Sequence, residues 1–320
     1  MATVLHITNG ESVLHGFQAG RIPGEHLSWS DVLHDGPVPF TPELEDLSEI
    51  RAAALAGFGG HQYKPIRRTF GHRDRTLRDS ANQDEVVLWF EHDLFDQLQL
   101  LQLLDFFALH PVRRLSLIQI DRHPEVDPFY GLGQLSGHQL KELLDQRARV
   151  TPGQLAIGQE AWRAFRASEP VALAVIAQRH MPEMPFLAVA LHRFLEEYPS
   201  TFNGLSRVQY ELLAAASKGH QRKHDLYQES QKLEVCPWGD SSVYMRLDGL
   251  ARSGGALVAS AGSYELTDLG KQLLEGEADW IRAHGGLDTW LGGVHLTGPE
   301  AEWRWDGTHL VHNQAGVAHG

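Results

Sequence analysis

The chain has almost no cysteine and no long apolar segment. Its single cysteine, Cys236, excludes an internal disulfide and any metal cluster built from several cysteines. No stretch of about 18 consecutive apolar residues is present, so the sequence predicts no membrane-spanning helix and no membrane partner. Residues 1–6 lack both the basic segment and the long apolar core of a secretory signal peptide. We therefore expect a reducing, cytoplasmic environment.

Positive charge is also scarce. Lys and Arg number 28 against 41 Asp and Glu, which gives a formal net charge of -13. Such a chain is a poor general binder of polyanions, because contacts to phosphates need positive potential. One stretch is a local exception and holds Lys64, Arg67, Arg68, Arg73, Arg75 and Arg78. It can clamp a phosphate or carboxylate group, or it can be the solvated face of a helix.

The common catalytic signatures are absent from the sequence. It has no Walker loop, no Gly-x-Ser-x-Gly elbow and no His-Glu-x-x-His motif. The segment Asn9-Gly10-Glu11-Ser12 has one glycine, whereas the dinucleotide-binding pattern has three. A phosphate could still rest on the start of a helix near Ser12. These patterns therefore name no specific cofactor.

What the sequence does contain is an abrupt change of character at residue 91. Five apolar residues, 86–90, are typical of a strand that is buried on both faces. Three adjacent ionisable residues follow, Glu91, His92 and Asp93, and an apolar helical pattern begins at Leu94. We expect the three residues at a turn between a parallel strand and a helix, where open α/β sheets bind ligands.

The order of strand and helix patterns predicts an α/β chain in three parts. Residues 1–130 alternate helices with strands at residues 4–7, 26–29, 86–90 and 115–120, which indicates a Rossmann-like domain with a mainly parallel sheet. Residues 131–204 are predicted to be a helical linker region punctuated by prolines. Residues 205–311 have the pattern of a winged-helix-like α+β domain with a short β tail. Residues 312–320 are expected to be a disordered tail.

Polar residues follow each predicted strand, and the carboxyl ends of parallel strands meet at one edge of a sheet. Asp, Glu and His at such an edge can act as acids and bases or hold a hard metal ion. Some of these residues can instead have structural roles: Ser12 and Asp93 can be helix N-caps, and Asp35 can belong to a turn. The candidate catalytic residues are Glu91, His92, Asp93, Asp31 and His34, and the candidates for holding a cofactor or ligand are Asn9, Gly10, Ser12 and Arg73.

Three motifs in this region are similar to those of a known bacterial family. They are residues 5–12 (LHITNGES), 29–38 (WSDVLHDGPV) and 88–98 (LWFEHDLFDQL). In this order they resemble the family numbered 1835 among the domains of unknown function, over about residues 3–125. The family usually has Asp where this chain has Glu11. The resemblance implies an α/β sheet domain with a site built from these motifs, followed by a commonly associated C-terminal region, but it implies no reaction.

Two functions follow from these patterns. The first is an enzyme that acts on a small phosphorylated or nucleotide-like ligand, with Glu91, His92 and Asp93 as acid–base groups or metal ligands and Arg73 neutralising the ligand. The residues after the second strand would face them. The second is a ligand-sensing regulator that binds DNA or a partner protein through residues 205–285. A basic, exposed third helix in that segment favours the regulator, and an acidic or buried one does not.

Overall fold

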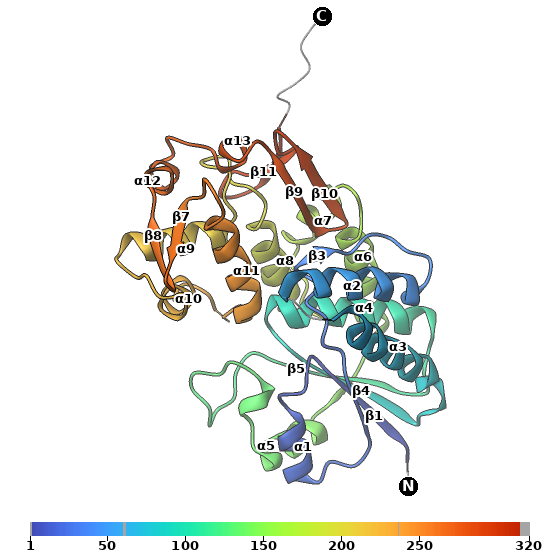
Figure 1. Ribbon diagram of the computed structural model, residues 1–320. Helices are drawn as coiled ribbons and strands as arrows, with labels where there is room; N and C mark the ends of the chain where they lie inside the picture. Colours follow the sequence, from blue (N-terminus) through green and yellow to red (C-terminus); the bar gives the residue numbers. More distant parts are fainter. Residues whose placement is uncertain (1, 60–61, 236, 314–320) are drawn as a thin grey trace, which may run out of the picture. The chain divides into compact units, whose positions relative to one another are not determined.

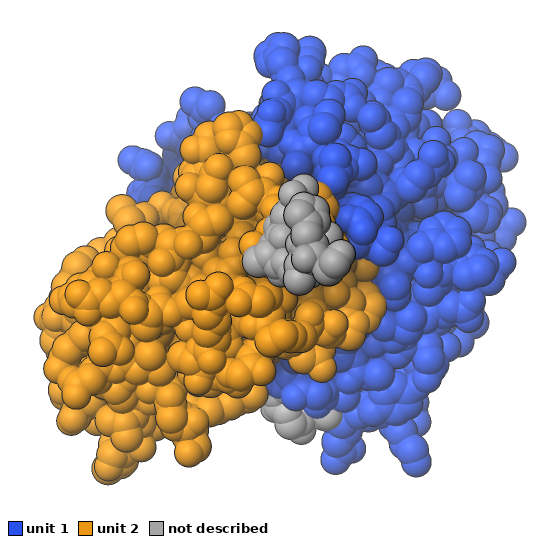
Figure 2. All heavy atoms as spheres, turned by 90° about the horizontal axis from the view of Figure 1, so that it is seen from above, with its two compact units in different colours: residues 1–191 blue, residues 192–320 orange. Residues whose placement is uncertain are grey.

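The computed structural model describes residues 2–59, 62–235 and 237–313. The chain divides into two compact units, Met1–Leu191 and His192–Gly320, which are coloured separately in Figure 2. Each unit has its own buried apolar core. Over the described ranges, the helices lack the combined length and apolar character that crossing a membrane requires.

A five-stranded sheet forms the centre of the first unit (Figure 1). Four strands are parallel, and β6 pairs with β5 in the antiparallel direction. All seven residues of β4 are buried, as expected for a central strand that is covered on both faces. The mainly parallel α/β sheet predicted from the sequence is therefore confirmed. In spatial order the strands are β2 (Glu25–Ser28), β1 (Val4–Thr8), β4 (Glu85–Glu91), β5 (Leu115–Ile120) and β6 (Ala148–Arg149).

Two helices cover one face of this sheet. They are α1 (Leu14–Gly20) and α5 (Gly137–Asp145), and the short helix η2 (Leu132–Gln134) precedes α5 in the chain. Trp89 of β4 belongs to the apolar cluster between the sheet and these helices. Because side chains alternate along a strand, Glu91 points to the same face as Trp89.

Four further helices lie on the other side of the sheet in Figure 1: α2 (Leu44–Gly59), α3 (Tyr63–Asp79), α4 (Leu94–Leu109) and α6 (Pro152–Phe165). The helices α4 and α6 pack tightly against each other, because α6 has a glycine at the contact. A Cβ atom on Gly158 would lie 2.4 Å from Cβ of Leu104. The close approach therefore depends on a residue without a side chain.

The predicted helical linker is not a separate part of the molecule. The helices α5 and α6 and the strand β6 all come from residues 131–204, yet they pack on the sheet or on α4 within the first unit. The boundary between the two units falls at residue 191, not at 204, because α4 is too apolar to stay uncovered on its outer side. The remaining short elements are β3 (Gly36–Pro37), η1 (Ser80–Asn82), α7 (Val171–Ile176) and α8 (Leu187–Leu195), and α8 spans the boundary.

After the end of α8, the second unit continues with three helices and a hairpin. A further antiparallel pair, β9 and β10, and a small pair, β11 and β12, form the β tail. Residues 314–320 of the predicted disordered tail lie outside the described residues. The elements are α9 (Arg207–Ser217), α10 (Lys223–Ser230), α11 (Asp240–Leu250), β7 (Leu257–Ser260), β8 (Ser263–Leu266), α12 (Asp268–Glu275), α13 (Trp280–Ala283), β9 (Leu287–Gly292), β10 (Val294–Gly298), β11 (Trp303–Trp305) and β12 (Leu310–His312).

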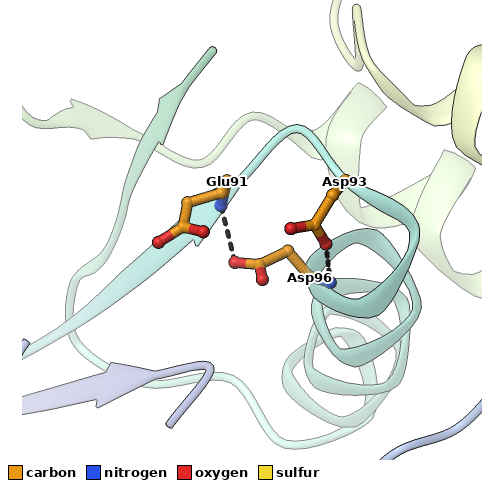
Figure 3. Close-up of side chains that lie close together, drawn as sticks. All are labelled: Glu91, Asp93 and Asp96. Carbon is orange, nitrogen blue, oxygen red and sulfur yellow. Dashed lines mark hydrogen bonds between the residues drawn. The ribbon is translucent and has the colours of Figure 1, made fainter. Parts of the chain in front are cut away.

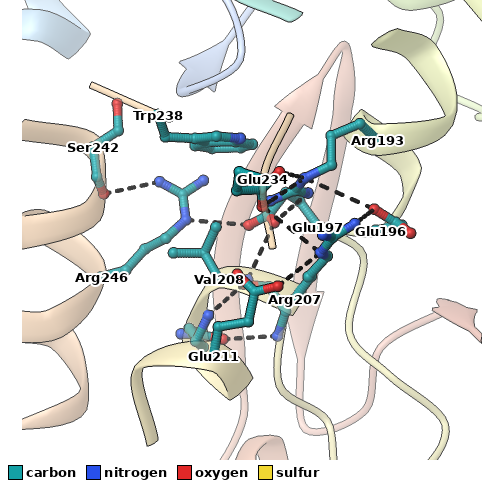
Figure 4. Close-up of polar contacts among 12 residues, drawn as sticks. Arg193, Glu196, Glu197, Arg207, Val208, Glu211, Glu234, Trp238, Ser242 and Arg246 are labelled. Carbon is teal, nitrogen blue, oxygen red and sulfur yellow. Dashed lines mark hydrogen bonds and ion pairs between the residues drawn. The ribbon is translucent and has the colours of Figure 1, made fainter. Parts of the chain in front are cut away.

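Arginine and glutamate side chains form a network of ion pairs in the second unit (Figure 4). Glu197 is buried and lies 2.8 Å from Arg193 and 3.2 Å from Arg246. Burial raises the pKa of Glu197, but the two arginines outweigh burial, so its pKa lies below the usual value. The indole ring of Trp238 is 4.6 Å from the Arg193 guanidinium and 4.9 Å from that of Arg246. We call this set the ion-pair network: Arg193, Glu196, Glu197, Arg207, Glu211, Glu234 and Arg246.

Candidate functional site

The strand order of the first unit has a switch point between β1 and β4. The chain runs from β1 to β2 on one side of β1, and then crosses to β4 and β5 on the other side. In open α/β sheets, ligands bind outside the carboxyl ends of the strands at such a point. Asn9 follows β1 and Glu91 ends β4, so both residues lie at this position.

Three carboxyl groups meet at the switch point: Glu91, Asp93 and Asp96, which we call the carboxylate cluster (Figure 3). One oxygen from each lies within 4.8 Å of the others. Asp96, on the first turn of α4, is fully buried and accepts two hydrogen bonds of 2.7 Å, one from the Glu91 backbone N–H and one from Asn9 Nδ2. Asp96 therefore connects the ends of β1 and β4.

Backbone groups hold the other two carboxylates. Asp93 is the N-cap of α4, because its Oδ1 accepts a 2.9 Å hydrogen bond from the Asp96 N–H, and the structural role expected for it is confirmed. Glu91 Oε1 accepts a 2.6 Å hydrogen bond from the N–H of Leu132. A Cβ atom on Gly131 would lie 2.7 Å from Glu91 Oε2. The cluster is thus enclosed by the β4–α4 turn and by the start of η2.

Burial and mutual repulsion raise the pKa values of all three groups. Burial, with the charge of Asp93, raises the pKa of Glu91 to about 7. Burial also raises the pKa of Asp93, and burial with the charges of Asp93 and Glu91 raises that of Asp96 well above its usual range. Among the described residues, no lysine or arginine forms an ion pair with the cluster. The cluster can therefore lower its free energy by keeping protons or by binding a cation.

His92 lies in the same turn, between the cluster and the end of β5. Its ring is half-buried and lies 5.9 Å from the ring of Phe186. The pKa of Asp121, the residue after β5, is lowered mainly by Arg122, and the charge of His92 contributes to the lowering. The polar residues after β4 and β5 are therefore neighbours, as the convergence of strand ends predicts.

Asp31 belongs to a different cluster. It is fully buried, and its Oδ1 lies 2.9 Å from Arg51 Nη2. The same guanidinium donates hydrogen bonds to the carbonyl oxygens of Val32, Asp35 and Pro37 at 2.7, 2.6 and 3.2 Å. Asp31 therefore anchors the arginine that holds the loop before β3. The expectation that Asp31 faces the carboxylate cluster is not supported, because its charge is matched by Arg51 instead.

His34 reaches the region of the cluster through an apolar contact. Its buried ring lies 6.2 Å from the ring of Phe95, which is on the first turn of α4. Its Nε2 is 3.8 Å from Oδ2 of Asp35. The loop after β2 is thus packed against the same helical turn that carries Asp96, and the catalytic role predicted for His34 stays a prediction.

The structure corrects the ligand-neutralising role predicted for Arg73. Its side chain is 2% exposed, and its guanidinium lies 4.2 Å from the ring of Trp29 and 3.9 Å from that of Phe70. It donates hydrogen bonds to Ser48 Oγ at 2.9 Å and to Asp74 Oδ1 at 3.2 Å. A guanidinium that is enclosed in the core and bonded to protein groups is not placed to neutralise a ligand.

Acidic residues from α2 and the segment before it balance part of the remaining basic stretch. Arg78 lies 2.6 Å from Glu45 and 3.3 Å from Glu43, and Arg67 pairs with Glu49. These side chains are partly exposed. The arrangement agrees with a solvated helix face, which was one of the two interpretations of this stretch, and it leaves less positive charge for a phosphate clamp.

Of the residues that follow β1, Asn9 enters the carboxylate cluster and the others have different neighbours. The carbonyl oxygen of Gly10 accepts a 2.7 Å hydrogen bond from Thr8 Oγ1. Ser12 is exposed beside Gly133, whose Cβ, if present, would lie 3.0 Å from Ser12 Oγ. Because α1 begins at Leu14 with Val13 as its N-cap, Ser12 does not cap this helix.

Sequence reasoning missed Asp96, although a signal for it exists. The apolar pattern that begins at Leu94 treats Asp96 as an ordinary polar position of a helix. Asp96 follows the N-cap Asp93 by three residues, however, and residues at this spacing lie on the same side of a helical turn. Two acidic residues at this spacing, directly after a buried strand that ends in Glu91, predict a three-carboxylate cluster.

No protein-family model matches the chain, and no curated protein matches it. The resemblance to family 1835 therefore stays a prediction. What the molecule offers as a candidate site is the carboxylate cluster with Asn9 and His92, at the switch point of a parallel sheet.

Proposed function

We propose that the chain is an enzyme that binds a small phosphorylated or nucleotide-like ligand at the carboxyl edge of its N-terminal sheet, through a divalent cation held by the carboxylate cluster. One observation carries the proposal: three carboxyl groups converge at the switch point with no arginine or lysine paired to them in the described residues. Such an arrangement costs stability unless a proton or a cation compensates it, and costly arrangements of this kind concentrate at functional sites.

The ligand chemistry of the cluster supports a cation of the Mg²⁺ or Mn²⁺ type. Carboxylate oxygens are the donors that these ions prefer, and the ions commonly keep positions for water and for substrate phosphates. The cation would offset the charge of Glu91, Asp93 and Asp96 and would attract an anionic ligand to an otherwise acidic edge. In the free site, Glu91 has a pKa of about 7, which also suits proton transfer near neutral pH.

Calorimetric titration with MnCl₂ tests the cation site. We expect the wild type to bind Mn²⁺ with release of protons, because the cation replaces protons on the carboxyl groups. The affinity should rise as the pH increases through about 7, since Glu91 must lose its proton before it can bind the cation. Failure of the wild type to bind Mn²⁺ would contradict the proposal.

Two variants separate the cluster from a general charge effect. Glu91→Gln keeps the shape of the side chain but removes a ligand oxygen, so we expect the Mn²⁺ affinity to fall at least about tenfold. Asp105→Asn is the matched control, because Asp105 lies further along α4 and burial raises its pKa as well. It should bind Mn²⁺ as the wild type does, and an equal loss in both variants would count against the cluster.

A thermal-shift screen of nucleotides and phosphorylated metabolites addresses the ligand. Binding to the native state raises apparent stability by mass action. We expect the largest shifts when the phosphorylated compound and Mn²⁺ are both present. Shifts that are the same with and without the metal would show that the ligand does not bind through the cation.

For the second unit, we propose a winged-helix-like fold over residues 205–285. The order of α9, α10, α11 and the hairpin β7–β8 supports it. The hairpin turns at Ala261 and Gly262, whose positive φ angles of 50° and 82° are those of a tight two-residue turn. The element order alone does not assign a partner to this segment.

The regulator alternative is better supported with a protein partner than with DNA. The helix α11 carries Asp240 and Asp248, and its one arginine, Arg246, is bound to Glu197 in the ion-pair network. A helix that reads DNA normally has a positive surface. Near the end of α10, Leu233 and Val235 are each 77% exposed and offer an apolar surface. We expect no salt-dependent mobility shift with upstream DNA, and such a shift would restore the DNA alternative.

A further inference from the structure

A positively charged side chain beside the cation would strengthen the binding of a phosphorylated ligand, and the loops around the site contain one. Four loops leave the carboxyl ends of the parallel strands: residues 9–13 after β1, 29–35 after β2, 92–93 after β4 and 121–131 after β5. All of these residues are described, and Arg122 is the one Lys or Arg among them. The two arginines behind the β2 loop, Arg51 and Arg73, are buried and bonded to protein groups.

The strand register places the backbone of residues 121 and 122 beside the turn that carries the carboxylate cluster. Ile120, the last residue of β5, pairs with Glu91, the last residue of β4. Asp121 and Arg122 therefore leave the sheet beside His92 and Asp93, and the charge of His92 acts on the carboxyl group of Asp121. In the sheet, β4 lies between β5, which precedes Arg122 in the chain, and β1, which precedes Asn9.

The guanidinium of Arg122 is available for exchange. Its side chain is 83% exposed, and both bonds shown for it go to its neighbour, from Nε to Asp121 Oδ1 at 3.0 Å and from Nη2 to Asp121 Oδ2 at 2.9 Å. Exposed ion pairs of this kind contribute little to stability. The planar fork that now holds a carboxylate fits two phosphate oxygens equally well.

We propose that Arg122 is the specificity-determining residue for the anion: it leaves Asp121 and binds the phosphate of the ligand whose cation sits on the carboxylate cluster. This inference rests on the proposed function, and it adds the group that selects a phosphorylated ligand over a neutral one. It also replaces Arg73, whose buried position excludes that role. Asp121 then acts as an internal competitor that occupies the guanidinium in the absence of ligand.

The chain contains a matched control for Arg122. Arg113 is 74% exposed and pairs with Asp84, so it is also an exposed arginine bound to one aspartate next to β4 and β5. It lies just before β5, however, at the amino end of the strands. Replacement of Arg113 thus removes the same charge from the same sheet at the opposite edge.

The test uses Mn²⁺ alone and then inorganic pyrophosphate in the presence of saturating Mn²⁺, both by calorimetry on the full chain. For Arg122→Gln we expect an unchanged or slightly higher Mn²⁺ affinity and a loss of at least about tenfold in pyrophosphate affinity, since a bidentate charged contact is removed. Arg113→Gln should stay within about twofold of the wild type for both. Asp121→Asn should bind pyrophosphate a few-fold more tightly, because the competitor is weakened.

The outcomes distinguish the inference from the proposed function. If the wild type binds Mn²⁺ but not pyrophosphate, the inference about Arg122 is overturned and the cation site stands. The same conclusion follows if Arg122→Gln and Arg113→Gln reduce the pyrophosphate affinity equally. If the wild type does not bind Mn²⁺, the proposed function is overturned and the inference falls with it. When the pyrophosphate titration is repeated at about 0.5 M salt, we expect weaker binding, because salt screens the contact between the arginine and the phosphate.

Discussion

The molecule buries carboxyl groups in two regions and compensates them differently. In the ion-pair network, Glu197 contacts Arg193 and Arg246, and its pKa is lowered despite burial. In the carboxylate cluster, the partners of Glu91 and Asp96 among the described residues are neutral donors and other carboxyl groups, and the pKa values of both are raised. Burial acts in the same direction in both regions, so the difference comes from the presence or absence of arginine.

This difference separates a structural from a functional use of buried charge. A compensated network is complete by itself, and removal of one member leaves its partner unpaired in a poorly hydrated place. An uncompensated cluster of carboxylates lowers the stability of the folded state until a proton or a cation binds to it. The two regions should therefore respond in opposite ways when a negative charge is removed, and four predictions test this contrast.

The largest effect is expected in the ion-pair network. Glu197→Gln leaves Arg246 and part of Arg193 without a counter-charge, so we expect the second unit to lose about 3 kcal/mol of stability. Urea unfolding at pH 7, followed by tryptophan fluorescence, measures this. Glu160→Gln is the control, because Glu160 pairs with Arg179 on the surface at 2.7 Å, and its loss should cost no more than about 0.5 kcal/mol. Equal effects of the two substitutions would refute the distinction.

Removal of a charge from the carboxylate cluster should stabilise the protein instead. The pKa of Glu91 is raised in the folded state from 4.5 to about 7, so this group favours folding at low pH and the advantage is lost as pH rises through 7. Glu91→Gln should therefore be more stable than the wild type by about 2 kcal/mol at pH 8 in metal-free buffer, and by little at pH 5. A stability difference that does not change between pH 5 and pH 8 would contradict the cause given for the raised pKa.

The geometry of the cluster can be disturbed without a change of charge. A methyl group at residue 131 would lie 2.7 Å from Glu91 Oε2, so Gly131→Ala should displace this carboxylate and weaken Mn²⁺ binding about tenfold. Gly57→Ala is the control, since a Cβ at residue 57 meets nothing within 4 Å, and it should leave Mn²⁺ affinity unchanged. Unaltered Mn²⁺ affinity in Gly131→Ala would show that Glu91 is not a ligand.

The smallest effect is expected for Glu211, a member of the ion-pair network whose pKa is raised, as the pKa values of the carboxylate cluster are. Burial raises the pKa of Glu211 to about 7, although Arg207 opposes the shift at 2.9 Å. Because the folded-state pKa is raised, the stability of Glu211→Gln relative to the wild type should increase from pH 5 to pH 8, by no more than about 1 kcal/mol. Urea unfolding at both pH values measures it. A loss at pH 8 as large as that of Glu197→Gln would place Glu211 with the fully compensated acids.

The sequence predicts the parts of the site that depend on local pattern. The apolar run before Glu91 places β4, and the ionisable turn before Leu94 places the start of α4, because buried strands and helix caps leave short-range signals. The convergence of Asn9 with the β4 turn follows from the rule that parallel strands end at one edge. Asp96 was within reach of the same reasoning through its spacing from Asp93.

The parts that could not be predicted depend on partners distant in the sequence. Arg73 was expected at the ligand because a basic stretch predicts positive surface, but Trp29 and Ser48 enclose it from other elements. Asp31 was expected at the site edge, and the arginine that binds it is 20 residues away. Whether a charged side chain is matched inside the protein is decided by packing, which local pattern does not encode.

The loop between β2 and β3 is held in place mainly through one side chain. Its carbonyl groups at Val32 and Asp35, and that of Pro37 in β3, all accept hydrogen bonds from the guanidinium of Arg51. These contacts come from Nη1 and Nη2 of one side chain, so all three depend on the position of Arg51. The shape of the segment that carries His34 to the edge of the site therefore depends on a single side chain, and a change at Arg51 would act on three of its backbone carbonyl groups at once.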